Sequence, residues 1–290
     1  MLTLEQSTLN VIETKGLDSI PLEAFQFNWR KLYNIFNSTF SKFERFCPQV
    51  KTIYTNGGNP LIMPDDCIYP RAIGFGNKLM IPPQTVAVDR QNWSYDRRTK
   101  ELSVFTRTNT VSSFQVQYLA KYADIKQDDV YISYNTLSGE SNITIELDLV
   151  PEQFSINISK DNVKFELCSK DFNHWYFETD LDKAILNLTT LEINFRLQDA
   201  SESTISISYT PLYPAKESPM DESLDFFETW YAANILSSLG NIKSVLRMDQ
   251  LPNDINADSL ASQGKELLED VKNYQKDKQF WFTGYISARI

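Results

Sequence analysis

At 290 residues, the chain is longer than most single domains and can hold one large domain or two modest ones. Hydrophobic residues make up 42% of it, which is enough for a substantial core and excludes an intrinsically disordered chain. Its 28 basic and 38 acidic residues give a net charge of −10, which disfavours partners rich in phosphate, both nucleic acids and anionic membranes.

The cysteines and the N-terminal residues indicate the kind of compartment in which the protein is expected. The three cysteines, Cys47, Cys67 and Cys168, are widely spaced and form no CxxC pair, so we expect neither a zinc site nor a disulfide framework, and a reducing compartment. The first residues, Met1 to Leu9, have neither the basic start nor the apolar run of a secretion signal. No stretch approaches the roughly 20 apolar residues of a membrane-spanning helix. We expect no membrane partner, bound metal or cofactor.

Residues 1–55 are predicted to form an N-terminal helical segment. Ser19 can cap a helix that tolerates Pro21 in its first turn and ends at Pro48. Apolar residues follow at spacings of three and four: Phe25, Trp29, Leu32, Phe36, Phe40 and Phe43. This aromatic face has two possible placements, in the protein's own core or against a neighbouring subunit.

Residues 56–84 are predicted to be an extended Gly/Pro arm. Four glycines and five prolines break any regular period between Asn56 and Pro83, yet hydrophobic residues remain frequent. A long irregular segment is unusual inside one compact domain. A second chain could cover such an arm and satisfy its backbone hydrogen bonds.

Residues 85–214 alternate between apolar and polar side chains, the pattern of half-buried strands. The alternation is clearest over 143–149, 163–167, 191–197 and 205–209, and weaker over 86–88, 102–106, 114–118, 130–134 and 154–158. No helical run separates these strands, so the sheets should be mainly antiparallel. The spacing of the strands predicts a β-sandwich-like domain or a small barrel.

The helical period returns after Pro219. One stripe runs from Phe227 through Tyr231 to Leu246, and a second helix is expected from about Ala257 to Lys278, so residues 220–282 should form an antiparallel helical hairpin. Residues 283–290 are predicted to be a strand-like tail that could add to a sheet. The predicted fold class is α+β, with a mainly antiparallel β-sandwich-like middle, an N-terminal helix and a C-terminal hairpin.

The chain has few residues suited to catalysis. Its one histidine, His174, is followed by Trp175-Tyr176-Phe177 and is expected at the start of a strand. Paired acids, such as Asp65-Asp66 and Asp128-Asp129, lie in expected turns or in the arm. The glycines of 56–60 and 74–76 lack the helix and lysine of a phosphate-binding loop. We therefore predict no catalytic residue.

Two regions carry a family resemblance. They hold Asn92-Trp93-Ser94-Tyr95-Asp96, Thr99-Lys100-Glu101-Leu102, Ser238-Leu239-Gly240-Asn241-Ile242-Lys243, the turn Asp249–Ile255, and Leu260 to Leu267 around Gly264. Together these resemble virion structural proteins of large tailed bacteriophages, of the neck, head–tail connector or tail/baseplate type. The likeness covers about 85–105 and 225–282. It implies a subunit of a homo-oligomeric ring, assembled in the host cytoplasm and in contact with other virion proteins.

If the chain has a structural role of this kind, we expect six aromatic residues to form its interface. They would be buried against neighbouring subunits or against the hairpin: Phe25, Trp29, Phe36, Phe40, Tyr231 and Trp281. An accessory protein of a secretion machine would look the same. A second hypothesis is a carbohydrate-binding or adhesion module, with Trp93, Tyr95, Trp175 and Tyr176 as sugar-stacking candidates. A third is a hydrolase that uses two carboxylates, for example Asp65 and Asp128.

Overall fold

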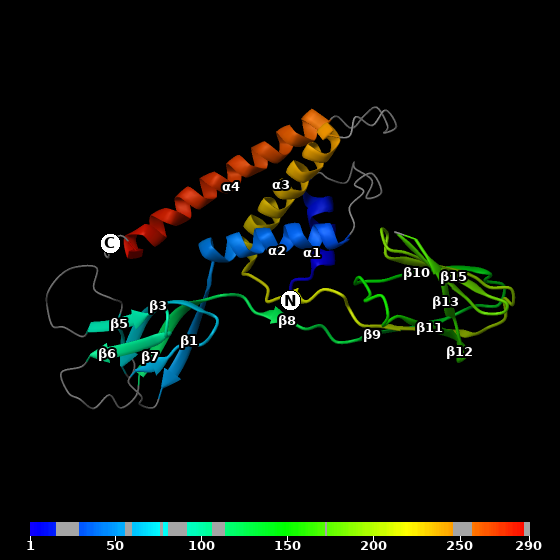
Figure 1. The fold of residues 1–290 in the computed structure, drawn as a ribbon, viewed down its shortest axis with the longest axis horizontal. Helices are drawn as coiled ribbons and strands as arrows, with labels where there is room; N and C mark the ends of the chain where they lie inside the picture. Colours follow the sequence, from blue (N-terminus) through cyan, green and yellow to red (C-terminus); the bar gives the residue numbers. More distant parts are fainter. Residues whose placement is uncertain are drawn as a thin grey trace. The chain divides into compact units, whose positions relative to one another are not determined.

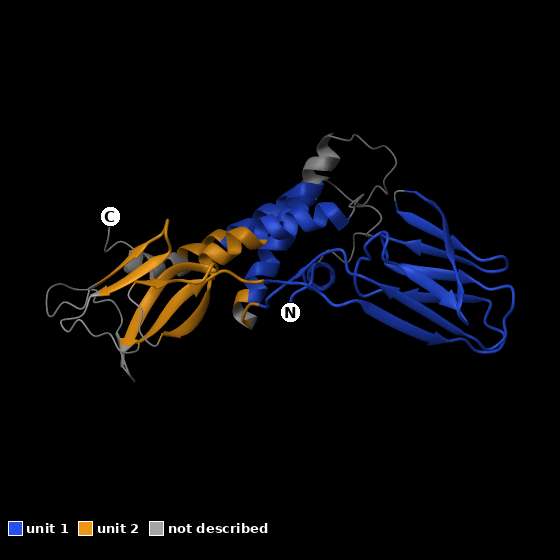
Figure 2. Cartoon of the chain, turned by 60° about the horizontal axis from the view of Figure 1, so that its bottom comes forward, with its two compact units in different colours: residues 1–39, 124–218, 224–271 blue, residues 40–123, 219–223, 272–290 orange. Residues whose placement is uncertain are grey.

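The protein is mixed α+β, as the sequence predicts. A computed structural model describes residues 1–15, 29–55, 60–75, 78–80, 92–105, 114–171, 173–245 and 257–286. The chain divides into two compact units, coloured separately in Figure 2. Unit 1 comprises Met1–Thr39, Asp124–Ser218 and Leu224–Val271; unit 2 comprises Phe40–Ala123, Pro219–Ser223 and Lys272–Ile290.

Unit 1 contains a sandwich of two antiparallel sheets (Figure 1). The five-stranded sheet has the order β10-β16-β15-β14-β13 and the four-stranded sheet the order β12-β11-β17-β9. The strands of the first are β10 (Asn142–Glu146), β13 (Glu166–Lys170), β14 (His174–Glu178), β15 (Lys183–Asn187) and β16 (Glu192–Arg196). Those of the second are β9 (Val130–Asn135), β11 (Asn157–Lys160), β12 (Val163–Lys164) and β17 (Thr204–Tyr209).

The period-2 alternation explains why these residues form a sandwich. In β16, Ile193 and Phe195 are buried while the residues beside them face outward, and Ile205 and Ile207 do the same in β17. Phe165 lies between β12, an edge strand of the four-stranded sheet, and β13, an edge strand of the five-stranded sheet. Its ring packs edge-on against that of Phe195. The residues from 163 to 167, expected as one strand, therefore divide between the two sheets.

A short helix that the sequence reasoning missed opens unit 1. It is α1 (Leu4–Thr14), and Thr3 caps it by accepting a hydrogen bond from the Gln6 N–H. Leu2 forms an antiparallel bridge with Lys216 in β18 (Ala215–Lys216), which itself pairs with β8 (Asp124–Ile125). The helix is easily missed because polar residues such as Ser7 and Thr8 lie on its buried face.

The aromatic helix is α2 (Trp29–Phe46), and it ends just before Pro48, as predicted. Residues 16–28, which include Ser19, Pro21 and Phe25, lie outside the described residues. Residues Phe36 and Phe40 of this helix are both buried, so the stripe takes the core placement of the two that the sequence allowed.

The predicted helical hairpin is formed by α3 (Asp221–Val245) and α4 (Ala257–Ile286). Gly264 lets the two helices approach closely, because a Cβ added there would lie 3.2 Å from both the Leu236 Cβ and the Ser237 backbone nitrogen. The prediction of a strand-like tail over residues 283–290 is corrected for residues 283–286. Residues 283–286 continue α4 through Gly284, and residues 287–290 are not described.

Unit 2 has two small antiparallel sheets. One has the order β1-β7-β3-β4, from β1 (Gln49–Thr55), β3 (Cys67–Phe75), β4 (Lys78–Met80) and β7 (Phe114–Ala120). The other has the order β2-β6-β5, from β2 (Leu61–Ile62), β5 (Asn92–Asp96) and β6 (Glu101–Phe105). They share one hydrophobic core, to which Leu102 and Val104 of β6 and Val116 and Tyr118 of β7 contribute.

The Gly/Pro arm expected over 56–84 is also corrected. Its described residues form β2, β3 and β4, and β3 pairs with β7 along most of its length. The register shifts between Cys67 and Tyr69 and again between Pro70 and Ala72, so the strand accommodates Pro70 at an irregularity. The boundary within 85–214 likewise moves, because residues up to Ala123 belong to unit 2 and the sandwich begins after them.

None of the described helices has the combination of length and apolarity that crossing a bilayer requires.

Candidate functional site

The residues predicted to form an interface lie mostly inside the protein. Trp29, Phe36, Phe40 and Tyr231 are buried, with Tyr231 fully so. Phe25 lies outside the described residues, and Trp281 lies in α4 with its side chain outside them. The roles of Phe25 and Trp281 therefore remain predictions.

The buried rings of unit 1 form a cluster between α2 and α3. Phe36 packs edge-on against Phe227 at 5.3 Å and against Tyr231 at 5.6 Å between ring centroids. The Tyr231 hydroxyl shares a hydrogen bond with the Thr8 hydroxyl of α1, and burial raises the pKa of Tyr231. This cluster holds the helices of unit 1 together.

Of the paired carboxylates, Asp65 and Asp66 are engaged in ion pairs, whereas Asp129 accepts a hydrogen bond from the Thr210 hydroxyl. Asp65 lies 2.6 Å from the Lys100 Nζ, whose hydrogen bond and charge lower the Asp65 pKa. Asp66 pairs with Lys51 at 3.0 Å and accepts a hydrogen bond from the Tyr118 hydroxyl. Within the part of the chain that is described, no three His, Cys, Asp or Glu side chains gather closely enough to hold a metal ion.

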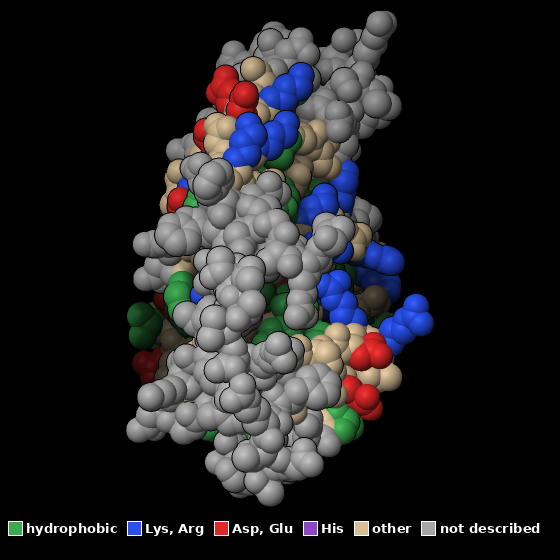
Figure 3. Space-filling view, turned by 90° about the vertical axis from the view of Figure 1, so that its left-hand side faces the viewer, with side chains coloured by type: hydrophobic (Ala, Val, Ile, Leu, Met, Phe, Trp, Pro, Cys, Tyr) green, Lys and Arg blue, Asp and Glu red, His purple; other side chains and the backbone are tan. Residues whose placement is uncertain are grey.

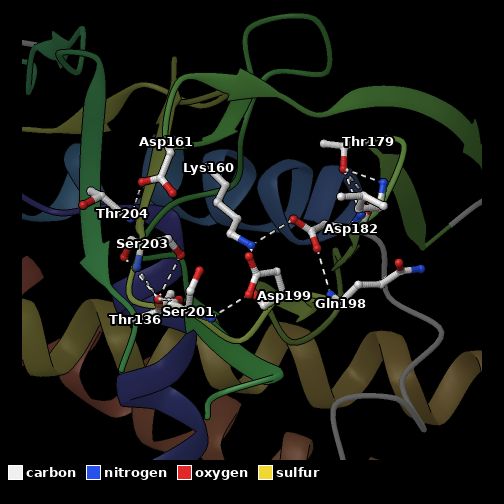
Figure 4. Close-up of polar contacts among 11 residues, drawn as sticks. Thr136, Lys160, Asp161, Thr179, Asp182, Gln198, Asp199, Ser201, Ser203 and Thr204 are labelled. Carbon is white, nitrogen blue, oxygen red and sulfur yellow. Dashed lines mark hydrogen bonds and ion pairs between the residues drawn. The ribbon is translucent and has the colours of Figure 1, made fainter. Parts of the chain in front are cut away.

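A polar network in unit 1 surrounds Lys160 at the end of β11 (Figure 4). The Lys160 Nζ lies 3.1 Å from Asp182 Oδ2 and donates to the Asp199 carbonyl oxygen, also at 3.1 Å. Asp182 Oδ1 accepts the Gln198 N–H at 2.9 Å, and the Thr179 hydroxyl accepts the Asp182 N–H. The network connects β11 of one sheet with the β14–β15 turn of the other.

A second group in the same view joins neighbouring loops. The Thr136 hydroxyl lies 2.9 Å from the Ser203 hydroxyl and accepts the Ser203 N–H, while Asp161 accepts the Thr204 N–H (Figure 4). Each of these polar groups forms a hydrogen bond with another part of the protein, as polar groups that stabilise a fold usually do. We assign the network to stability of the sandwich.

The feature best suited to contact another molecule is β1 in unit 2. Among the described strands, β1 has a neighbour, β7, along one side, so half of its backbone N–H and C=O groups point away from the sheet. Its residues alternate strictly in exposure. Ile53 packs against the core of unit 2, whereas Val50 and Tyr54 are 50% and 79% exposed.

The outward side of β1 carries no charged side chain. Val50, Thr52 and Tyr54 face solvent there, while Lys51, which pairs with Asp66, lies on the opposite face of the strand. Natural edge strands usually carry charged side chains, proline or a bulge to prevent pairing. Of the described edge strands of the sandwich, β13 carries Glu166 and Lys170, whereas β9 carries no charged side chain. We define Val50, Thr52 and Tyr54, with the backbone groups of β1 that point away from β7, as the β1 edge.

Sequence reasoning missed the β1 edge. Its signal was the run from Val50 to Thr55 directly after Pro48, which is rich in β-branched and aromatic residues. The missing information was the sheet order, which alone decides whether a strand is central or at an edge.

The electrostatic surface is mixed despite the acidic total. Figure 3 shows groups of Lys and Arg side chains among Asp and Glu on the face it presents.

Comparison with known proteins found no matching family model, no similar curated protein and no similar solved structure.

Proposed function

We propose that the chain is a structural subunit of a multi-subunit phage particle, of the neck, connector, tail or baseplate, and that it acts through protein–protein contacts. The observation that carries the proposal is the β1 edge. The phage setting comes from the resemblance over 85–105 and 225–282, and no enzymatic step is part of the proposal.

The proposed occupant of the β1 edge is a neighbouring copy of the chain. A strand from that copy would pair with the N–H and C=O groups of β1 that point away from β7, and Val50 and Tyr54 would be buried against it. Backbone pairing supplies affinity, while alternate side chains supply specificity. A head-to-tail contact of this kind, repeated between copies, closes into a ring when the rotation from one copy to the next divides a full turn.

The oligomeric state tests the proposal. The purified chain should form a species larger than a monomer, measured by light scattering during size-exclusion chromatography. Tyr54→Lys and Val50→Lys should each shift the population toward monomer, because a buried lysine at the contact leaves an unpaired charge.

The matched control is Phe154→Lys. Phe154 is 86% exposed and lies in a turn, so the same change of aromatic ring to charge should leave assembly intact. Assembly that survives Tyr54→Lys would reject the β1 edge as the contact. A concentration-independent monomer, absent from purified particles of the source phage by mass spectrometry, would overturn the structural role altogether.

A further inference from the structure

The outer face of the five-stranded sheet in unit 1 carries a second surface feature. Strand registers place Tyr176, Ile185, Asn194 and Thr144 in one row across four strands. These side chains alternate with buried ones, so the row faces outward. A depression of about 490 Å³ lies over this row. Its volume falls within the roughly 300–1,000 Å³ of small-ligand sites.

The rings at one end of the depression are held in place by Asp171. Its carboxylate lies 3.4 Å from His174 Nδ1 and accepts a hydrogen bond from the Tyr176 hydroxyl at 3.2 Å. The N–H groups of Asn173 and His174 also donate to Asp171 and lower its pKa. The two rings lie 6.3 Å apart between centroids. Both contacts with Asp171 favour the orientation in which the two rings face the depression.

Donor groups without a protein partner surround the same row. Thr144 donates to Asn194 Oδ1 at 2.8 Å, which fixes the amide and leaves the Asn194 NH₂ without a partner among the described residues. Asn187 accepts the N–H groups of Thr189 and Thr190 through its oxygen, so its NH₂ is likewise unpaired.

Arg196 lines the depression as well, and no described residue accepts from its guanidinium. The neighbouring Lys183, by contrast, pairs with Glu178 at 3.2 Å. Such donors match a ligand that presents hydroxyl and carbonyl oxygens.

Charge argues for a neutral ligand. Arg196 is the only lining residue with a permanent charge, and the carboxylates of Glu146 and Glu192 project from the next row of the same face. Two adjacent carboxylates would repel an anionic ligand and offset the attraction of one arginine.

We propose that this face binds a neutral oligosaccharide. The Tyr176 ring and the Ile185 side chain would contact the apolar C–H face of a sugar, and Asn187, Asn194 and Arg196 would donate to its hydroxyl or acetamido oxygens. The site is separate from the β1 edge, which lies in unit 2, so it does not depend on the proposed assembly role.

An array printed with neutral oligosaccharides of hexoses and N-acetylhexosamines, and with sialylated, uronic and sulfated ones, tests the proposal. The full chain should bind at least one neutral class. Calorimetric titration with that glycan should show Tyr176→Ala and Asn194→Ala each weakening affinity by about tenfold or more, through loss of the ring contact or of the amide hydrogen bonds.

The control is Tyr131→Ala, since Tyr131 is a 77% exposed tyrosine on the other sheet. Circular dichroism and thermal melting establish that each variant is folded, and Asn194→Ala carries the test if Tyr176→Ala does not fold. Binding of no neutral glycan, preference for acidic glycans, or equal loss in Tyr131→Ala would overturn the inference.

Discussion

The ion pair between Lys160 and Asp182 is almost withdrawn from water, with side chains 11% and 9% exposed. Lys160→Met should lower the free energy of unfolding by about 3 kcal/mol, because it leaves a carboxylate buried without its counter-charge. Adding Asp182→Asn should restore part of the loss, since the amide oxygen can still accept the Gln198 N–H. Urea unfolding of the natural protein, the single variant and the double variant measures both changes.

The pair of Lys183 and Glu178 provides the control for this prediction. Its side chains are 63% and 43% exposed, so Lys183→Met should change stability by less than about 0.5 kcal/mol. Equal losses at Lys160 and Lys183 would show that burial of the first pair does not matter.

Glu5 is a buried carboxyl on α1 and links stability to pH. Its Oε1 accepts the Val150 N–H at 2.9 Å, while Oε2 has no hydrogen-bond partner among the described residues. Burial raises the pKa of Glu5 above its ordinary 4.5. The folded protein therefore binds this proton more tightly than the unfolded chain does. Stability from this group is present below pH 4.5 and is lost as pH rises through the raised pKa.

Replacing Glu5 with glutamine removes the charge at every pH and keeps the oxygen that Val150 uses. We expect Glu5→Gln to unfold at higher urea concentration than the natural protein at pH 7.5, with the difference shrinking as pH falls toward 4.5. Glu13→Gln, on the exposed side of α1, should show no such trend. A difference independent of pH would contradict the assignment to Glu5.

At the scale of the elements, the hairpin of α3 and α4 depends on Gly264. A Cβ there would lie 3.1 Å from the Ser237 Oγ and 3.2 Å from backbone, so a larger side chain must push the helices apart. Gly264→Leu should cost about 1–3 kcal/mol in thermal or urea unfolding, despite the better helix propensity of leucine.

Gln263→Leu is the matched control because Gln263 precedes Gly264 in the same turn and faces solvent. It should alter stability by less than about 0.5 kcal/mol. A stabilising effect of Gly264→Leu would mean that the two helices are not in contact at this point.

At the scale of the whole molecule, neither of the two units is one continuous stretch of the chain. Unit 1 is built from three separate segments, and its first 39 residues contact strands and helices that follow more than 100 residues later. Examples are the hydrogen bonds of Glu5 with Val150 and of Thr8 with Tyr231. The assembly proposal belongs to this scale too, because the surface it uses exists only once the sheet of unit 2 has formed.

Local periodicity was sufficient to predict those elements that have one regularly apolar face. The alternating residues of β10, β16 and β17, the aromatic stripe of α2 and the two helices of the hairpin were all identified, because one face of each is buried and the pattern records it. The pattern failed for α1, where polar side chains are buried, and for β3, where glycine and proline lie within a strand.

The periodic pattern could not predict which distant segments of the chain pack against each other. An amphipathic stripe shows that Phe36 and Tyr231 are buried, but only the tertiary structure shows that they pack against each other instead of against a neighbour. Likewise, strand order leaves the β1 edge open, and register brings Tyr176, Ile185 and Asn194 into one row. Burial leaves a periodic trace along the sequence, whereas pairing between distant segments leaves none, so the amino-acid sequence determined the elements and the tertiary structure decided which surfaces they present.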